Sequence, residues 1–186
     1  DFIEQFQIDH STKKIKIKNN EITIKQNIHF PDNYFLDLDG DVTINLVNNA
    51  SIVFDSDIIV NQENHQLKFI GNDRNCIIFK NNNIKIKKIS FSGFSDCKVY
   101  GHFLTGGVNF YKSNLKLDTL IAKDNYSGDD LINIIKSEFE IKNLYLQNSL
   151  FDGLDIDYSS GNIINLRCED CGKSKGGDGI DLSHTN

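Results

Sequence analysis

The chain has 186 residues, a formal net charge of −6 and 39% hydrophobic residues, which fits one domain with a single sizeable core. The acidic balance disfavours a phosphate backbone as partner, so nucleic acid is not expected. No apolar run approaches the about 18 residues that cross a bilayer, since Asp55 and Asp57 interrupt the longest candidate. A single proline, the lack of a heptad pattern and many Ile, Leu, Val and Phe residues exclude the collagen, coiled-coil and disordered classes.

The first forty residues repeat poorly and contain the only proline, Pro31. An atypical terminal segment is what a repeat protein needs to shield its first unit from edge pairing. We therefore expect residues 1–40 to form an N-terminal cap with a first irregular coil, and residues 41–186 to form the coils of the same single domain. Because the sequence contains no methionine, we also expect a processed protein or a fragment of a longer chain.

A repeat of apolar residues fills the rest of the chain. From about Ile44, apolar residues alternate with other residues at the strand period, and no segment of ten or more residues has helical periodicity. The pattern that begins at Val108 returns three times, at successive offsets of 24, 22 and 26 residues. The coil before it matches at an offset of 31, which predicts an insertion around residues 92–106.

Short strands that recur at this period without helices predict a parallel β-helix, a solenoid, rather than an Ig-like sandwich. In stacked coils, equivalent residues form columns with a spacing of about 4.8 Å. Two columns are expected to point inward: Val108, Ile132, Leu154 and Ile180, with Phe110, Ile134, Ile156 and Leu182 beside them. Hydroxyl groups form a further column at the following bend: Ser113, Ser137, Ser159 and Thr185. We expect these hydroxyls to hydrogen-bond to one another or to the backbone.

The repeats resemble a known family at four segments, namely 104–113 (LTGGVNFYKS), 130–134 (DLINI), 152–157 (DGLDID) and 177–181 (GDGID). They are similar to bacterial right-handed parallel β-helix proteins of the pectin-lyase-like superfamily, and more narrowly to β-helix regions that accompany spore-coat-kinase-like segments. The resemblance covers about residues 75–186. It implies an all-β, right-handed parallel β-helix with coils of roughly 22–31 residues. It implies no single activity, because β-helices include lyases, hydrolases, epimerases, adhesins and inert spacers.

Aspartates recur on and beside the repeated strand. Those expected to point outward on one face are Asp155, Asp157 and Asp181, and those expected at the turn before it are Asp130, Asp152 and Asp178. Carboxylates on adjacent coils would lie about 5 Å apart, close enough for each to raise the pKa of the other. Such repulsion requires a structural or functional explanation.

Three interpretations of these aspartates stay open. The first is a solvated face, in which Asp-Gly pairs make ordinary turns and the side chains cap backbone amides. The second is a Ca²⁺ site, since Ca²⁺ takes oxygen ligands and suits an Asp ladder with Asn carbonyls such as Asn133. Its candidate ligands are Asp130, Asp152, Asp155, Asp178 and Asp181. The third is catalysis on a glycosidic bond by two carboxyl groups, with Asp155, Asp157 and Asp181 as candidates.

Polar residues near the same strands are candidates for ligand binding, namely Asn109, Asn133, Tyr158 and His184. Asn109 points away from the core if Val108 and Phe110 point into it. His184 follows Asp181 closely enough to be a general-acid candidate. It also takes the place of Tyr158 in the previous coil, which predicts an exposed column at the turn.

The cysteines are Cys76, Cys97, Cys168 and Cys171. Cys168 falls in the column of Ala122 and Leu146, which favours a buried free thiol. A Cys168–Cys171 disulfide is an alternative, and a zinc site is a weaker one because a structural zinc needs four ligands. The pattern does not fix the redox compartment.

The catalytic motifs of the resembled family are incomplete. Polygalacturonase-like enzymes combine an Asn-Thr-Asp strand, an Asp pair, a Gly-His-Gly turn and an Arg-x-Lys, whereas this chain has only Asp129-Asp130 and, upstream of it, Gly101-His102-Phe103. Pectate-lyase-like sites need an Arg base, and we expect Arg167 to pair instead with Glu169 or Asp170. The chain is therefore expected to be a binding module rather than an enzyme.

The expected function is an extracellular or surface-exposed module with a structural role or a role in binding a polysaccharide, a surface glycan or another protein chain. Because an uncovered coil can accept another strand, copies of the chain could also associate end to end. The alternative is a polysaccharide lyase or glycoside hydrolase that uses the Asp cluster. Ca²⁺ is the one cofactor that the cluster suggests.

Overall fold

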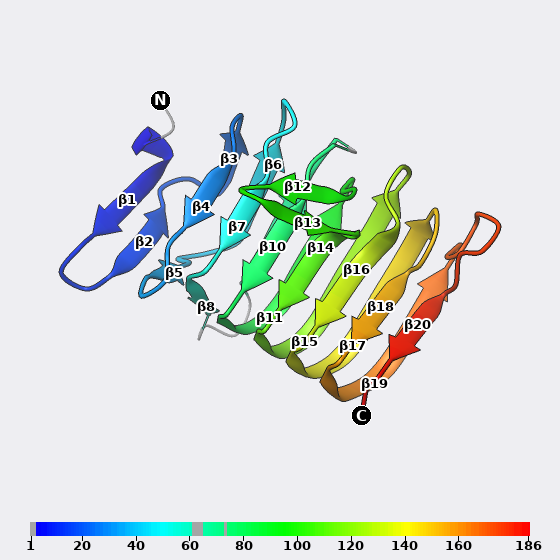
Figure 1. The fold of residues 1–186 in the computed structure, drawn as a ribbon. Coiled ribbons are helices and arrows are strands. Elements are labelled where there is room, and N and C mark those ends of the chain that lie inside the picture. Colours follow the sequence, from blue (N-terminus) through cyan, green and yellow to red (C-terminus); the bar gives the residue numbers. More distant parts are fainter. Residues whose placement is uncertain (1–2, 61–64, 73) are drawn as a thin grey trace.

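The computed structural model describes residues 3–60, 65–72 and 74–186, which form a β-solenoid of about seven turns (Figure 1). Strands stack in parallel from coil to coil, so the predicted fold class is confirmed. The elements are η1 (Ile3–Gln5), β1 (Phe6–Asp9), β2 (Lys14–Ile17), β3 (Glu21–Ile24), β4 (Ile28–Phe30), β5 (Phe35–Asp37), β6 (Val42–Leu46), β7 (Ile52–Phe54), β8 (Asp57–Ile59), β9 (Gln66–Ile70), β10 (Ile77–Lys80), β11 (Asn83–Ser92), β12 (Cys97–Val99), β13 (His102–Leu104), β14 (Gly106–Tyr111), β15 (Asn114–Asn125), β16 (Asp130–Ile135), β17 (Glu138–Ser149), β18 (Leu154–Asp157), β19 (Ser160–Glu169) and β20 (Ile180–Ser183). Within the described ranges, no helix is long and apolar enough to span a membrane.

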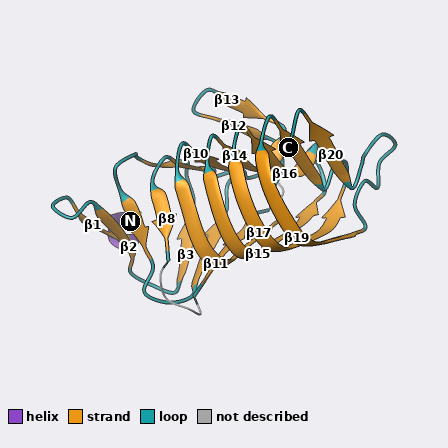
Figure 2. Ribbon diagram, turned by 90° about the horizontal axis from the view of Figure 1, so that it is seen from below, coloured by secondary structure: helices purple, strands orange, loops and turns teal. Residues whose placement is uncertain are grey.

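Two sheets enclose the core. Sheet B has seven strands in the order β20-β18-β16-β14-β10-β7-β4, and sheet A has eleven. In the early coils sheet A follows two paths, one through β5 and β8 and the other through β3, β6 and β9. β11 pairs with both paths, with β8 near its start and with β9 over its second half. From β11 onward the paths are therefore joined in long bent strands, which lie side by side in Figure 2.

The N-terminal segment combines a hairpin with a regular coil. β1 and β2 pair antiparallel, with Phe6 opposite Ile17, and β2 then pairs in parallel with β5. β3, β4 and β5 each pair in parallel with the equivalent strand of the next coil. Parallel stacking thus begins inside the range 1–40, and the antiparallel part ends at Ile17.

Aromatic and aliphatic columns fill the core. The rings of Phe30, Phe54, Phe79 and Phe110 are stacked coil upon coil, with centroids 4.6, 5.1 and 5.0 Å apart. The two predicted inward columns are in register across β14, β16, β18 and β20, which confirms the repeat offsets. Burial of each side chain contributes roughly 1.5–3 kcal/mol, and each ring pair about 0.5–1.5 kcal/mol more. Ile180 and Leu182 are exposed on the last described strand of sheet B.

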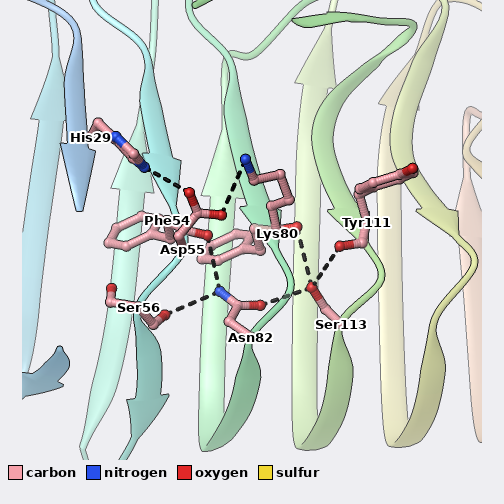
Figure 3. Close-up of polar contacts among 9 residues, drawn as sticks. His29, Phe54, Asp55, Ser56, Lys80, Asn82, Tyr111 and Ser113 are labelled. Atoms are coloured by element: carbon pink, nitrogen blue, oxygen red, sulfur yellow. Dashed lines mark hydrogen bonds and ion pairs between the residues drawn. The ribbon is translucent and has the colours of Figure 1, made fainter. Parts of the chain in front are cut away.

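The bend after sheet B holds the predicted hydroxyl column. Ser113 and Ser137 are both buried, and the backbone N–H of Ser113 donates to Ser137 Oγ at 3.0 Å. Ser113 Oγ donates to Asn82 Oδ1 at 2.8 Å, and the Asn82 amide donates to the carbonyls of Phe54 and Ser56 (Figure 3). The hydroxyls therefore connect neighbouring coils as the sequence predicts, and among the described residues none of them has a histidine partner.

The predicted insertion is a hairpin that lies on the outer face of sheet B (Figure 1). Its strands, β12 and β13, pair antiparallel, and a disulfide joins Cys97 on β12 to Cys76 before β10. Apolar residues of the hairpin and of the sheet pack into a second small core outside the solenoid: Val53, Cys76, Ile78, Cys97 and Val99, with Leu104 against them. The hairpin thus covers the N-terminal part of this outer face.

Candidate functional site: an acidic face on sheet B

The acidic cluster predicted from the repeats lies on the outer face of sheet B. Parallel register aligns Asn109, Asn133, Asp155 and Asp181 in one column across β14, β16, β18 and β20. The sequence neighbours of Asn133 and Asp155 on these strands belong to the core, so the column points away from it, as expected. We call the following set the acidic face: Asp129, Asp130, Asp152, Asp155, Asp157 and Asp181.

Asp130 is the buried member of the acidic face. Only 3% of the residue is exposed, because it begins β16 beneath the end of the hairpin. Thr105 Oγ1 donates to Asp130 Oδ2 at 2.6 Å, and Asn133 Nδ2 donates to the same oxygen at 3.1 Å. Asn133 Nδ2 also lies 3.1 Å from Thr105 Oγ1, so the three side chains form one network. This network connects the hairpin to the next coil of sheet B.

The environment of Asp130 favours its neutral form. Burial, together with repulsion from the nearby Asp155, Asp129 and Asp152, raises the pKa of the Asp130 carboxyl to about 7. The hydrogen bond from Thr105 acts in the opposite direction, because it stabilises the carboxylate. Near neutral pH, Asp130 therefore exists in both protonation states.

Asp155 has a similar but smaller displacement. Burial, together with repulsion from Asp157, Asp181, Asp152 and Asp129, raises its pKa to about 6. The pKa of Asp129 is also raised, first by burial and then by Asp152 and Asp96. Perturbed carboxyl groups of this kind concentrate at functional sites, although structural networks also produce them.

No cation within the described part of the chain neutralises the centre of the acidic face. Over residues 3–60, 65–72 and 74–186, Asp130, Asp155, Asp157 and Asp181 have no ion-pair partner. In the same ranges, no group of three or more His, Cys, Asp or Glu side chains has an arrangement that could hold a metal ion. The side-chain oxygens of Asn109 and Asn133 are buried without a hydrogen-bond partner. The face is therefore rich in oxygen atoms and poor in positive charge.

The turn aspartates have separate roles. Asp152 Oδ1 accepts a hydrogen bond of 2.6 Å from the backbone N–H of Asp178, one coil further on. Capping of a backbone amide is what the solvated-face interpretation predicts for an Asp-Gly turn. Asp178 itself is exposed, and the structure does not bring it into the group that shifts the pKa of Asp130 or Asp155.

The ligand-binding candidates differ in accessibility. Asn109 is fully buried and donates to the carbonyl of Gly106, and Asn133 is 2% exposed. A Cβ at Gly106 would lie only 2.8 Å from Asn109 Oδ1 and from Asn133 Cβ, so a glycine is required where the hairpin rejoins the sheet. Tyr158 and His184 lie at the turn after the acidic strands, with their rings stacked at 4.8 Å. Both are exposed, and both have positive φ.

All four cysteines form disulfides. The expectation of a buried free thiol at Cys168 is wrong, because Cys168 is only partly buried and bonds to Cys171. Cys168 is in the same column as Ala122 and Leu146, which are buried, and this position predicted burial. Cys168 is accessible because it lies in the last coil, which is partly open. Cys76–Cys97 was not predicted, because Cys97 lies in the insertion and has no counterpart in the repeat.

Arg167 forms an ion pair with Glu169, as expected. Thr105 was missed by the sequence analysis, although it donates the shortest hydrogen bond to Asp130. It lies between the insertion and the repeat, so no column position singles it out.

No protein family, curated protein or solved structure matches the chain.

Proposed function

We propose that this chain is an extracellular or surface-associated β-solenoid module that binds carbohydrate on the acidic face. The observation that carries the proposal is the pair of Asp155 and Asp181, which are neighbours in register on β18 and β20 and have no neutralising cation among the described residues, with the buried Asp130 close by. Carboxylate and amide oxygens accept hydrogen bonds from sugar hydroxyls without needing a cation. The exposed Tyr158 and His184 at the adjacent turn supply an apolar surface beside these acceptors.

The proposed location outside the cell is supported by the disulfides. Two of them, Cys76–Cys97 and Cys168–Cys171, use every cysteine of the chain. Structural disulfides form and persist in oxidising compartments and are rare in the cytosol. Membership of the pectin-lyase-like superfamily and end-to-end pairing at β20 are further proposals.

The test is a binding screen with neutral and acidic oligosaccharides, followed by isothermal titration calorimetry. We expect a ligand whose affinity falls at least about tenfold in Asp155→Asn/Asp181→Asn, since each lost charged hydrogen bond contributes about 1.5–3 kcal/mol. Asp39→Asn is the matched control, because Asp39 is exposed in an early coil away from the acidic face. A ligand that binds all three proteins equally would place its site elsewhere.

A second candidate function is hydrolysis or lyase cleavage of a polysaccharide. It is favoured by the raised pKa values of Asp130 and Asp155, because an acid catalyst must hold a proton near neutral pH while its partner carboxylate is ionised. Asp155, Asp157 and Asp181 were the catalytic candidates from the sequence, and Asp130 joins them. Release of reducing or unsaturated ends, lost in Asp130→Asn and in Asp155→Asn, would establish this function over simple binding.

A further inference from the structure

The side of the solenoid away from the acidic face has a groove rimmed by lysines. It has a volume of about 530 Å³ and crosses β11, β15, β17 and β19 where these long strands bend. Figure 2 shows this side of sheet A, and the β12–β13 hairpin lies at the top of the same view. The charged residues of the groove are Lys85, Lys87, Lys116 and Lys142, with Asp118 and Glu140. Lys142 Nζ lies 2.7 Å from Asp118 Oδ1. Four lysines against two acidic residues still leave the groove with a formal excess of positive charge in a chain of net charge −6.

Two of these lysines repel each other. Lys85 and Lys116 are direct neighbours in the parallel register of β11 and β15, and both are exposed. Like charges directly opposite each other on neighbouring strands are destabilising. Lys116 lies 3.9 Å from Glu140, whereas Lys85 has no ion-pair partner within the described ranges. An anionic partner placed over this pair would remove the repulsion.

The acidic face is the geometric counterpart of this lysine pair. Asp155 and Asp181 are direct neighbours in the register of β18 and β20, and they also repel each other. Both spacings are fixed by the distance between stacked strands, about 4.7–4.9 Å. Two carboxylates on one molecule therefore match two ammonium groups on another without any adjustment of either backbone. The two pairs point outward from opposite sheets, so they cannot meet within one molecule.

We infer that the acidic face of one copy of this chain docks into the lysine groove of a second copy. The contact joins different surfaces, so it is heterologous and extends into side-by-side chains of molecules rather than closing as a dimer. Nucleic acid is a poorer occupant, because no aromatic ring among the described residues lines the groove for a base to stack on. The contact is electrostatic, and it weakens as salt is added. This inference does not depend on the proposed carbohydrate ligand.

The test is charge reversal with complementation on the full 186-residue chain. Lys85→Glu/Lys116→Glu reverses the groove, and Asp155→Lys/Asp181→Lys reverses the acidic face. By sedimentation velocity at low ionic strength, we expect the wild type to associate with increasing concentration and to dissociate when salt is raised. Each variant alone is expected to associate at least about tenfold more weakly, because its two surfaces then carry the same sign. An equimolar mixture of the two variants restores association.

Controls separate this contact from unfolding and from other interfaces. Lys25→Glu/Lys175→Glu changes two exposed lysines outside the groove and leaves association unchanged. The milder Asp155→Asn/Asp181→Asn weakens association while the circular dichroism spectrum keeps its β-sheet form. A wild type that stays monomeric at low ionic strength overturns the inference. So does association that persists in both reversal variants, which would place the interface at the exposed end formed by β20.

Discussion

The aspartates on the outer face of sheet B differ in whether cationic side chains lie beside them. In the early coils, Asp55 lies 2.7 Å from His29 Nε2 and 3.3 Å from Lys80 Nζ, and both partners come from adjacent strands (Figure 3). In the later coils, Asp155 has Asp181 and Asn133 as its neighbours in register. The same sheet, the same direction of the side chains and the same coil spacing thus give one neutralised carboxylate and one uncompensated group.

This difference indicates that the solenoid does not require an uncompensated acidic face. Lys80 shows that a cation fits on the outer face of sheet B, and the hairpin shows that part of this face is covered by apolar residues. Where burial is not accompanied by a cation, as at Asp130 and Asp155, the pKa of the carboxyl group is raised. Uncompensated charge has a cost in folding free energy, so a ligand or a second molecule is the natural explanation for its presence.

The largest effect is expected from removing the disulfide that ties the β12–β13 hairpin to the early coils of sheet B. In Cys76→Ser/Cys97→Ser, we expect the free energy of unfolding to fall by about 2–4 kcal/mol, because the disulfide restricts a loop in the unfolded chain. The two cysteines are 21 residues apart. Urea denaturation measures the loss. Cys168→Ser/Cys171→Ser is the control, since its bridge spans only 3 residues and constrains the unfolded chain less. Equal losses in the two double variants would contradict this account of the hairpin.

The next effect is a dependence of stability on pH that originates in the acidic face. The pKa of Asp130 is about 7 in the folded state and near 4 in an unfolded chain. The folded state therefore keeps a proton that the unfolded state releases, and stability falls as pH rises from about 4 to about 7. The expected loss is on the order of 1–3 kcal/mol.

Asp130→Asn is expected to remove the part of this pH dependence that Asp130 contributes and to stabilise the protein above pH 7, as measured by thermal or urea unfolding across pH. The part that originates in Asp155, whose pKa is raised to about 6, is expected to remain. Asp39→Asn serves as the control, and it is expected to keep the slope of the wild type. If the stability of the wild type rises between pH 4 and pH 7, the folded state favours the ionised form of Asp130, and the prediction is wrong.

A smaller effect is expected from removing the lysine that pairs with Asp55 in the early coils. In Lys80→Ala, the partly buried Asp55 keeps only His29, and we expect a loss of about 1–2 kcal/mol because a charged group loses its partner. Lys88→Ala is a matched control, since Lys88 is an exposed lysine on the next strand along the chain. If both variants unfold at the same urea concentration, the ion pair at Asp55 contributes nothing and the comparison with Asp155 fails.

The smallest effect is expected from placing a lysine beside an aspartate of the acidic face, as Lys80 lies beside Asp55. Ser183 is the neighbour of Asp157 in register, as Lys80 is near Asp55. Ser183→Lys is therefore expected to stabilise the protein by about 0.2–1 kcal/mol at neutral pH, the usual range for opposite charges on neighbouring strands. The gain is expected to disappear in high salt. A destabilised Ser183→Lys protein would mean that the acidic face is less negative than its carboxyl groups suggest.

Most of the fold could be predicted from the sequence, because each coil of a solenoid repeats the apolar pattern of the coil before it. Val108 and Phe110 have counterparts in every later coil, and a constant spacing of strands turns that repeat directly into columns. The position of the insertion followed from the change of offset. Its hairpin form and its disulfide did not, since Cys97 and Thr105 have no repeat equivalent.

The acidic face was predicted in part. The outward direction of Asp155 and Asp181 follows from strand alternation. The burial of Asp130 and Asn109 does not, because it depends on the hairpin that covers them and on a close approach at Gly106. Alternation alone assigns Asn109 to an exposed face. A segment from outside the repeat converts that position into a buried one.

The central claim is that the acidic face holds carboxyl groups that the protein leaves uncompensated, and a carbon-detected NMR titration of the aspartate side chains tests it most directly. The account predicts transition midpoints of about 7 for Asp130 and about 6 for Asp155, assigned with Asp130→Asn and Asp155→Asn. Ordinary midpoints near 4 for both groups would contradict it, because the carboxylates would then be fully stabilised without any ligand or second molecule.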